Sequence, residues 1–248
     1  MESHDSTSSA TSSSTHPATP TQLHLIGGEK GGVGKSVLAR TLAQYFIDKS
    51  MPFTAFDTDK SHRSFQRFYA EYASPIVIDR YEALDGMMED VIQGGRRVLV
   101  DLAAQSFGLL TQWMEDSSVL DVTKDLGIAL TYWHVMDSSR DSVDLLSGAL
   151  DRFGNRLKLV VVLNEVRGTE FDILQESGLL DRAHSGGASV LRLPKLSDAA
   201  MQRIDQFNTS FWAASQINGG GSGLALFERQ RVKLWLSKIY QQLDSMQI

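Results

Sequence analysis

The sequence lacks cysteine, contains no long apolar run and has fewer basic than acidic residues. Without thiolates, the chain cannot form disulfides, hold an iron-sulfur cluster or build a cysteine-ligated zinc site. No window approaches the ~18 consecutive apolar residues that a membrane-spanning helix needs, so we expect no membrane partner. The formal net charge of -6 argues against a surface that binds polyanions over its whole extent.

Residues 1–21, MESHDSTSSATSSSTHPATPT, consist mostly of Ser and Thr. A segment with so few apolar residues cannot bury enough surface to offset the entropy lost on ordering. It also has neither the charged start nor the apolar stretch of a secretory signal peptide. We therefore expect a disordered tail over 1–21, a folded domain over 22–248, and a location in the reducing cytoplasm.

Short apolar runs follow from residue 22 onward. They are typical of strands and lie at 23–26, 53–57, 97–101, 127–135, 157–163 and 189–193, with helix-like spacing between most of them. Runs as apolar as 157-LKLVVVL-163 suit strands that are covered on both faces, which is how parallel sheets are built. The pattern predicts an α/β fold with a doubly wound, mostly parallel sheet and helices on both faces. A flexible loop is expected over 216–223, before a last helix over 224–246.

The stretch 27-GGEKGGVGKS-36 joins the first expected strand to a helix. Glycines at this junction let backbone N–H groups approach phosphate oxygens, and the helix N-terminus favours an anion. In such a P-loop, Lys35 contacts the outer phosphates and the Ser36 hydroxyl binds Mg²⁺. The alternative is a flexible turn without a ligand.

A second motif, 97-RVLVD-101, ends an apolar strand in a single carboxylate. A carboxylate in this position of a P-loop protein holds Mg²⁺ through its water shell. We assign that role to Asp101, with a simple aspartate at a strand end as the alternative.

The string 30-KGGVGKS-36 resembles the deviant Walker A loop of the ParA/MinD family of P-loop ATPases. The resemblance implies that Lys30 reaches across an ATP-bound dimer to the phosphates held by the other subunit, as an arginine finger does. The alternative for Lys30 is a solvated surface lysine. The nucleotide contacts that the family loop implies are Gly31, Gly32, Val33, Gly34, Lys35, Ser36 and Val37.

The second expected strand ends in 53-FTAFDTDK-60, which resembles the Asp-x-Asp element of the same family. The resemblance implies that Asp59 positions the attacking water, and we assign Asp57 to the metal site. Solvated carboxylates are the alternative for both. The chain departs from the family after each carboxylate motif, with Lys60-Ser61 here and 102-LAAQS-106 after Asp101.

The strand 157-LKLVVVLN-164 ends in Asn164, the position at which family members read adenine. An amide offers both a donor and an acceptor, which suits the adenine edge, although an asparagine that serves a turn is the alternative. Pro194, in 191-LRLPKLSDAA-200, resembles the loop that covers the base from the other side. Because 164-NEVR-167 lacks the Lys-x-Asp that would read guanine, we expect ATP as the nucleotide.

The resemblance implies an ATPase that forms a homodimer with ATP and Mg²⁺, is stimulated by a partner protein, and segregates or positions a cargo such as a plasmid or protein complex. Small family members bind DNA nonspecifically, which implies nucleoid association. The basic candidates for that contact, whose alternative is a solvated helix face, are Arg203, Arg229, Arg231, Lys233 and Lys238. Two other functions stay open: a metabolic ATP-dependent synthetase on the same fold, and a switch in conjugation, secretion or organelle placement that acts without DNA.

Overall fold

The structure is a computed structural model that describes residues 21–94, 96–216 and 223–248. The expected tail, apart from Thr21, and most of the expected loop over 216–223 lie outside the described residues. The order, pairing and packing of the elements below refer to the described ranges.

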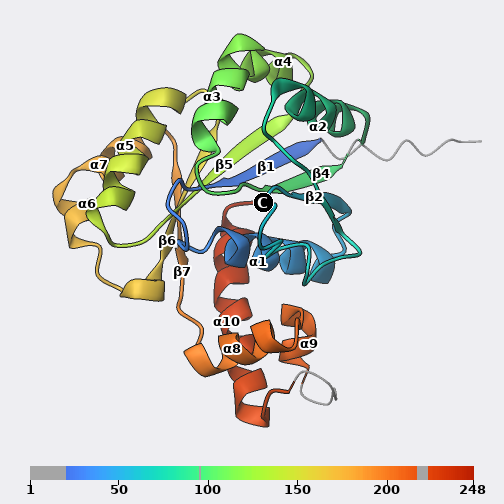
Figure 1. The fold of residues 1–248 in the computed structure, drawn as a ribbon. Helices are drawn as coiled ribbons and strands as arrows, with labels where there is room; N and C mark the ends of the chain where they lie inside the picture. The colour runs from blue at the N-terminus through green and yellow to red at the C-terminus, as the bar shows by residue number, and fades with distance from the viewer. Residues whose placement is uncertain (1–20, 95, 217–222) are drawn as a thin grey trace, which may run out of the picture.

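Seven strands form one sheet in the order β3-β2-β4-β1-β5-β6-β7, and each pairing is parallel (Figure 1). The strands are β1 (Gln22–Gly27), β2 (Phe53–Asp57), β3 (Ala73–Pro75), β4 (Arg97–Asp101), β5 (Ala129–Met136), β6 (Lys158–Asn164) and β7 (Ser189–Leu193). The predicted doubly wound parallel sheet is confirmed. Strand β3 was not predicted, because three residues ending in proline carry no readable alternation; proline is tolerated there since β3 lies at the sheet edge.

Helices cover both faces of the sheet, as predicted. They are α1 (Lys35–Asp48), α2 (Tyr81–Gly94), α3 (Phe107–Asp116), α4 (Val119–Asp125), α5 (Arg140–Phe153), α6 (Asp172–Glu176), α7 (Leu179–Ser185), α8 (Asp198–Gln206), α9 (Phe211–Ser215), α10 (Leu226–Ser245) and the 3-10 turn η1 (Glu165–Arg167). One core lies between the sheet and α1 and α10 and extends to α8 and α9, which pack against these helices, and a second lies between the sheet and α2 to α7. The last helix is two residues shorter at its start and one at its end than the predicted 224–246.

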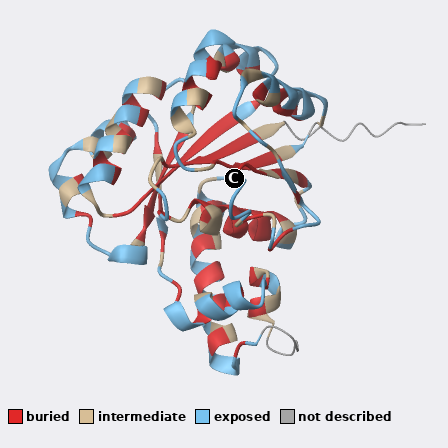
Figure 2. Cartoon of the chain, viewed as in Figure 1, coloured by how far each residue is buried: buried red, intermediate tan, exposed pale blue. Residues whose placement is uncertain are grey.

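The strands are buried on both faces, which Figure 2 shows as continuous burial through the sheet. Along β1, Leu23 and Leu25 pack into the core under α2 to α7, whereas Ile26 packs into the core under α1. This alternation follows from the period of two in a strand. Both cores together explain why the strand sequences read as nearly unbroken apolar runs.

The carboxyl ends of β1, β2, β4 and β5 meet at one edge of the sheet. In register, Asp57 at the end of β2 lies beside Asp101 at the end of β4, and Asp101 lies beside Ile26 of β1. From β1 the chain runs to β2 and β3 on one side, and β5, β6 and β7 are added on the other. Ligands of open α/β sheets bind at such a switch in strand order.

Candidate functional site

The glycine loop runs from the end of β1 to the start of α1 at this edge. Gly28 and Gly34 have φ values of 138° and 102°, in the region that favours glycine. A side chain at Gly28 would collide with the carbonyl of Val135, and one at Gly34 with the amide of Asn164. The loop therefore needs glycine at both positions because strands β5 and β6 press against it.

A cleft of about 770 Å³ opens beside the loop. It brings together many of the residues that the sequence assigned to nucleotide and metal: Gly31, Gly32, Gly34, Lys35, Ser36, Val37, Asp59 and Asp101. Lys30, Val33, Asp57, Asn164 and Pro194 are not among its lining residues in the described chain. The cleft thus contains most of the residues expected at the phosphates and at Mg²⁺, whereas Lys30, Asp57 and the two expected base-reading residues do not line it.

Lys35 lies within the loop, with its side chain turned back on the backbone. Its Nζ donates to the carbonyl of Lys30 at 3.1 Å, and the residue is 8% exposed. Burial lowers the pKa of Lys35, while the carboxylates of Asp101, Glu29 and Asp59 oppose that shift. A phosphate oxygen in the cleft would give this ammonium the anionic partner that a backbone carbonyl supplies only in part.

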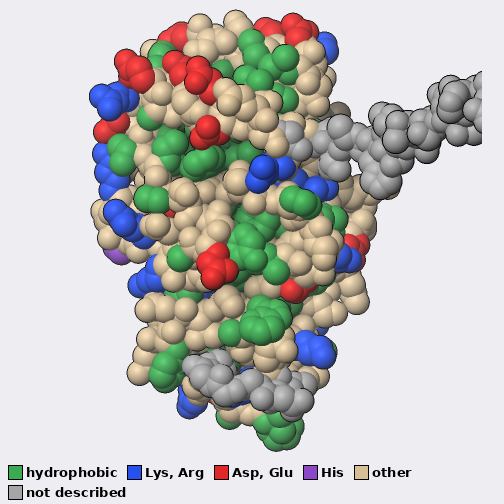
Figure 3. Space-filling model, turned by 90° about the vertical axis from the view of Figure 1, so that its right-hand side faces the viewer, with side chains coloured by type: hydrophobic (Ala, Val, Ile, Leu, Met, Phe, Trp, Pro, Cys, Tyr) green, Lys and Arg blue, Asp and Glu red, His purple; other side chains and the backbone are tan. Residues whose placement is uncertain are grey.

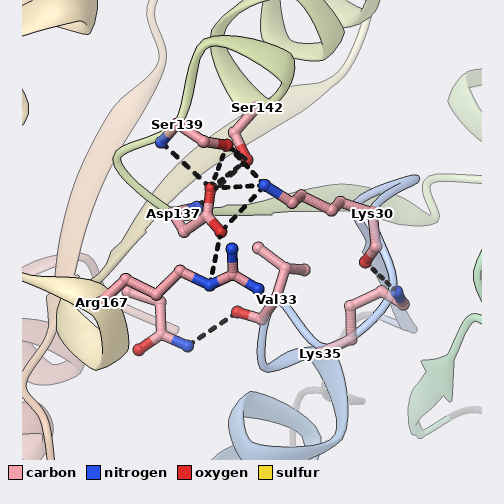
Figure 4. A network of polar contacts seen from close by, with 8 residues as sticks. Lys30, Val33, Lys35, Asp137, Ser139, Ser142 and Arg167 are labelled. Atoms are coloured by element: carbon pink, nitrogen blue, oxygen red, sulfur yellow. Dashed lines mark hydrogen bonds and ion pairs between the residues drawn. The ribbon is translucent and has the colours of Figure 1, made fainter.

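Lys30 points in a different direction from Lys35 (Figure 4). Its Nζ lies 3.2 Å from Oδ2 of Asp137 and donates to Oγ of Ser139 at 2.6 Å. Asp137 follows β5 and its side chain is fully buried, whereas the Lys30 side chain is 20% exposed. The two lysines of one loop are therefore held by different partners in this conformation.

Asp101 ends β4 and lines the cleft, with 2% of the residue exposed. Neither of its carboxylate oxygens accepts a hydrogen bond of normal geometry from the described residues. Burial raises the pKa of Asp101 to about 7; the neighbouring Ser36 hydroxyl and Lys35 lower it, and Asp57 raises it further. A buried carboxylate whose pKa is raised in this way fits a role beside a bound cation, which would stabilise its charged form.

The described residues contain no cluster of three or more His, Asp or Glu side chains that could hold a metal ion unaided. This agrees with the chemistry of Mg²⁺, which is usually bound through one or two protein ligands, waters and the phosphates of its nucleotide. Ser36 and Asp101, which share the cleft, are the residues that fit such a shared site.

The two aspartates after β2 have different surroundings. Asp57 accepts backbone N–H bonds from Asp59 at 3.0 Å and from Phe65 and Gln66 at 2.9 Å. Its carboxylate therefore shapes the loop in this conformation, and its assignment to the metal stays a prediction. Burial alone would raise the pKa of Asp59, but hydrogen bonds from Ser61 and His62 outweigh it and keep the pKa below its ordinary value. Asp59 is thus an anion that faces the cleft at neutral pH.

Asn164 braces the glycine loop in the structure. Its Nδ2 donates to the carbonyl of Val33 at 2.7 Å and its Oδ1 accepts from the N–H of Val166 at 3.2 Å. One donor and one acceptor position of the amide remain, so the adenine role stays a prediction. Pro194 follows β7, and its carbonyl accepts a hydrogen bond from Trp235 Nε1 at 2.6 Å.

Two of the five basic candidates for DNA contact are engaged within the chain. Arg203 donates to the carbonyl of Gly223 and lies 3.6 Å from Glu228, and Arg229 donates to the carbonyls of Leu224 and Gln216. The remaining candidates, all exposed on α10, are Arg231, Lys233 and Lys238. On the face shown in Figure 3, basic side chains are scattered among acidic and apolar ones rather than gathered in one patch.

Sequence reasoning missed Asp137, Ser139 and Arg167, which contact Lys30 or one another. One signal was available, since Asp137 directly follows an apolar strand, much as Asp57 and Asp101 end theirs. Sequence reasoning also missed the contact between the loops after β2 and β4, where Thr58 Oγ1 accepts from the N–H of Ala103 at 2.7 Å.

The chain matches a known protein family and is similar to several known proteins. Residues 25–205 match the family described as the CobQ/CobB/MinD/ParA nucleotide binding domain. Protein TraL from Escherichia coli is 26% identical over 248 residues, which cover 90% of this chain and 98% of that protein. Protein MobD from Acidithiobacillus ferrooxidans is 27% identical over 190 residues, which cover 73% and 81%.

Two solved structures share the fold. The MinC:MinD cell division protein complex of Aquifex aeolicus contains a chain with a TM-score of 0.51 and 12% identity, covering 86% of this chain and 95% of that one. A nucleotide-binding protein in complex with ADP from Archaeoglobus fulgidus has a TM-score of 0.50 and 13% identity, covering 76% and 86%. None of the helices in the described ranges is long and apolar enough to cross a membrane.

Proposed function

We propose that this chain, which belongs to the CobQ/CobB/MinD/ParA nucleotide binding domain family, is an ATP-dependent switch that dimerises with ATP and hydrolyses it to position or segregate a cargo. The main support for this proposal is that two lysines of one glycine loop point in different directions. Lys35 lies inside the loop, and Lys30 is turned toward Asp137. A loop that served only its own nucleotide would need Lys35 alone.

In the proposed mechanism, the loop N–H groups and Lys35 cradle the phosphates of ATP. Ser36 and, through water, Asp101 would hold Mg²⁺, which would supply charge stabilisation to the transferring phosphoryl group. Asp59, anionic and facing the cleft, orients the water that attacks the γ-phosphate. Lys30 of the second subunit approaches the same phosphates, where a cation delivered in trans is worth on the order of 10³ to 10⁵ in rate in well-studied cases.

The same proposal covers the base of the nucleotide and the protein and DNA partners of the chain. Asn164 uses its remaining donor and acceptor to read adenine, with Pro194 on the other side of the base, so the nucleotide is ATP. A partner protein stimulates hydrolysis, and the chain works in the cytoplasm. Nonspecific DNA binding and nucleoid association would depend on cations other than Arg203 and Arg229, because these two arginines already have partners within the chain.

A second candidate is the same switch without DNA, acting only through proteins in conjugation, secretion or organelle placement. The engaged arginines and the scattered cations of Figure 3 favour it. The test is retention on DNA at low salt with a non-hydrolysable ATP analogue. Retention that weakens steeply with salt supports the DNA-binding form, and no retention supports the protein-only form.

A metabolic synthetase on the same fold is the rival from another class. The discriminating experiment is sedimentation with Mg²⁺-ATP and with ADP, together with turnover in the absence of any second substrate. A switch forms a dimer with ATP and turns over far more slowly than the enzyme median of about 10 s⁻¹. A monomer in both nucleotides that hydrolyses ATP only when a carboxylate substrate is added would contradict the proposal and favour the synthetase.

A further inference from the structure

The contacts of Asp137 go beyond a simple ion pair with Lys30. Its Oδ1 accepts hydrogen bonds from Oγ of Ser139 at 2.6 Å and from Oγ of Ser142 at 2.7 Å. Its Oδ2 lies 3.2 Å from Lys30 Nζ and 3.2 Å from Nε of Arg167. A fully buried carboxylate therefore has two cations where one would neutralise it (Figure 4).

The two cations differ in how they are held. Lys30 comes from the glycine loop, with three of its contacts on Asp137 and Ser139. Arg167 comes from η1, directly after the β6 strand that ends in Asn164, and its side chain is 53% exposed. Arg167 is thus carried by a different segment from Lys30, although both cations contact the same oxygen of Asp137.

A buried charge that loses its partner is strongly unfavourable, because its desolvation is no longer compensated. If Arg167 were missing, the departure of Lys30 would leave the buried carboxylate of Asp137 without either of these two cations. With Arg167 in place, the carboxylate keeps a cation and the hydroxyl groups of Ser139 and Ser142. The second cation therefore lowers the free energy needed to move Lys30 away.

We propose that Asp137 and Ser139 hold Lys30 in its own subunit, and that Arg167 is a positioning residue that takes over Asp137 when Lys30 moves to the partner subunit's nucleotide. This inference rests on the proposed function for the destination of Lys30. The contacts of Lys30 with Asp137 and Ser139, called the hold on Lys30 below, are present in the single chain without nucleotide. They can therefore be tested separately from dimerisation.

The first test measures the hold without ATP. Acetylation of Lys30 by an amine-reactive acetyl ester is followed by mass spectrometry, with Lys60 as the internal reference because it pairs with Asp79 at a separate exposed site. Ser139→Ala removes the 2.6 Å bond to Lys30 and leaves the Ser142 bond to Asp137. We expect Lys30 to react about fivefold faster, the factor that one ordinary net hydrogen bond gives. Asp137→Asn should increase the rate further.

Arg167→Ala should have the opposite effect, because it leaves Lys30 as the sole cation of Asp137. Lys30 should react more slowly than in wild type, and dimerisation with ATP should weaken by about fivefold or more, a loss that Arg167→Lys should partly restore. The matched control is Arg192→Ala. Arg192 lies 3.3 Å from Glu165, which is in the same turn η1 as Arg167, and no ion pair joins Arg192 to Asp137 in the described chain. A merely structural arginine would give the same result in both variants.

The outcomes separate the two proposals. Wild-type reactivity of Lys30 in both Ser139→Ala and Asp137→Asn overturns the hold, and faster reaction in Arg167→Ala overturns the role of Arg167. If the reactivities change as expected but wild-type protein does not dimerise with ATP, the hold on Lys30 is supported and the proposed function fails. If Arg167→Ala dimerises as tightly as the Arg192→Ala control, the exchange of partners is overturned.

Discussion

Replacing Asp101 by asparagine should make the metal-free protein more stable at high pH while abolishing magnesium-dependent hydrolysis. Asp101 is 2% exposed, and neither of its carboxylate oxygens accepts a hydrogen bond of normal geometry in the described chain. Burial raises its pKa to about 7, compared with about 3.9 for an unfolded chain. Proteins tolerate such a cost where the group has a function in the bound state.

The size of the effect follows from linkage between protonation and folding. For a carboxyl group whose pKa is raised on folding, the unfolded chain loses its proton first, so stability falls as pH rises from about 4 to about 7. The two pKa values give a cost of roughly 1 to 2 kcal/mol at pH 5 and roughly 4 kcal/mol at pH 8. The amide does not titrate. The stability of Asp101→Asn relative to wild type should therefore increase by roughly 2 to 3 kcal/mol between pH 5 and pH 8.

Urea denaturation in EDTA at the two pH values measures this difference, and the comparison cancels any constant penalty of burying an amide. The control is Asp121→Asn, which changes an exposed aspartate on α4 and should give the same pH dependence as wild type. Equal pH dependence in Asp101→Asn and wild type would refute the reasoning, because Asp101 would then titrate as an ordinary carboxylate.

Three further predictions concern other parts of the site and the core. Asp59→Ala should still bind Mg²⁺-ATP and dimerise but hydrolyse it at least ~10²-fold more slowly, because the lost carboxylate acts on the transition state; wild-type turnover would move the role to Asp57. Asn164→Ala should weaken ATP binding and reduce the preference for ATP over GTP in titrations, and an unchanged preference would remove the adenine role. His24 and His134 are buried, and burial lowers their pKa values to about 3 and about 4. Each histidine should therefore lower the free energy of unfolding of the protein by roughly 2 kcal/mol from pH 7 to pH 5, since the unfolded chain takes up the proton first. If denaturation of His24→Gln showed the same pH dependence as wild type, this prediction would be wrong.

The local motifs could be predicted from the sequence because each is a strand with a functional residue at its end. Lys35 and Asp101 are brought to one cleft, as the strand-loop-helix and strand-carboxylate patterns predict. Parallel strands gather their carboxyl ends at one edge, so predicting the strands was nearly enough to predict the cleft. The short edge strand β3 carried too little pattern to be found.

The contacts between distant segments could not be predicted in the same way. Lys30 meets Asp137 across 107 positions, and Asn164 meets the glycine loop across 131. These pairs depend on strand order, which places β5 and β6 on the side of β1 opposite β4, and no local spacing specifies that order. The carboxylate of Asp57 shows a related limit, because its sequence position resembles a ligand while its hydrogen bonds organise the following loop.

The most direct test of the central claim is whether Lys30 acts on the nucleotide of the other subunit. Lys30→Ala and Asp59→Ala should each be nearly inactive alone. In a mixed dimer, the subunit with intact Asp59 receives Lys30 from its partner, so one of the two sites is complete. Random pairing makes half of the dimers mixed, so an equal mixture should recover up to about a quarter of wild-type turnover. A mixture as inactive as its components, although sedimentation with ATP shows mixed dimers, would contradict a lysine that works in trans.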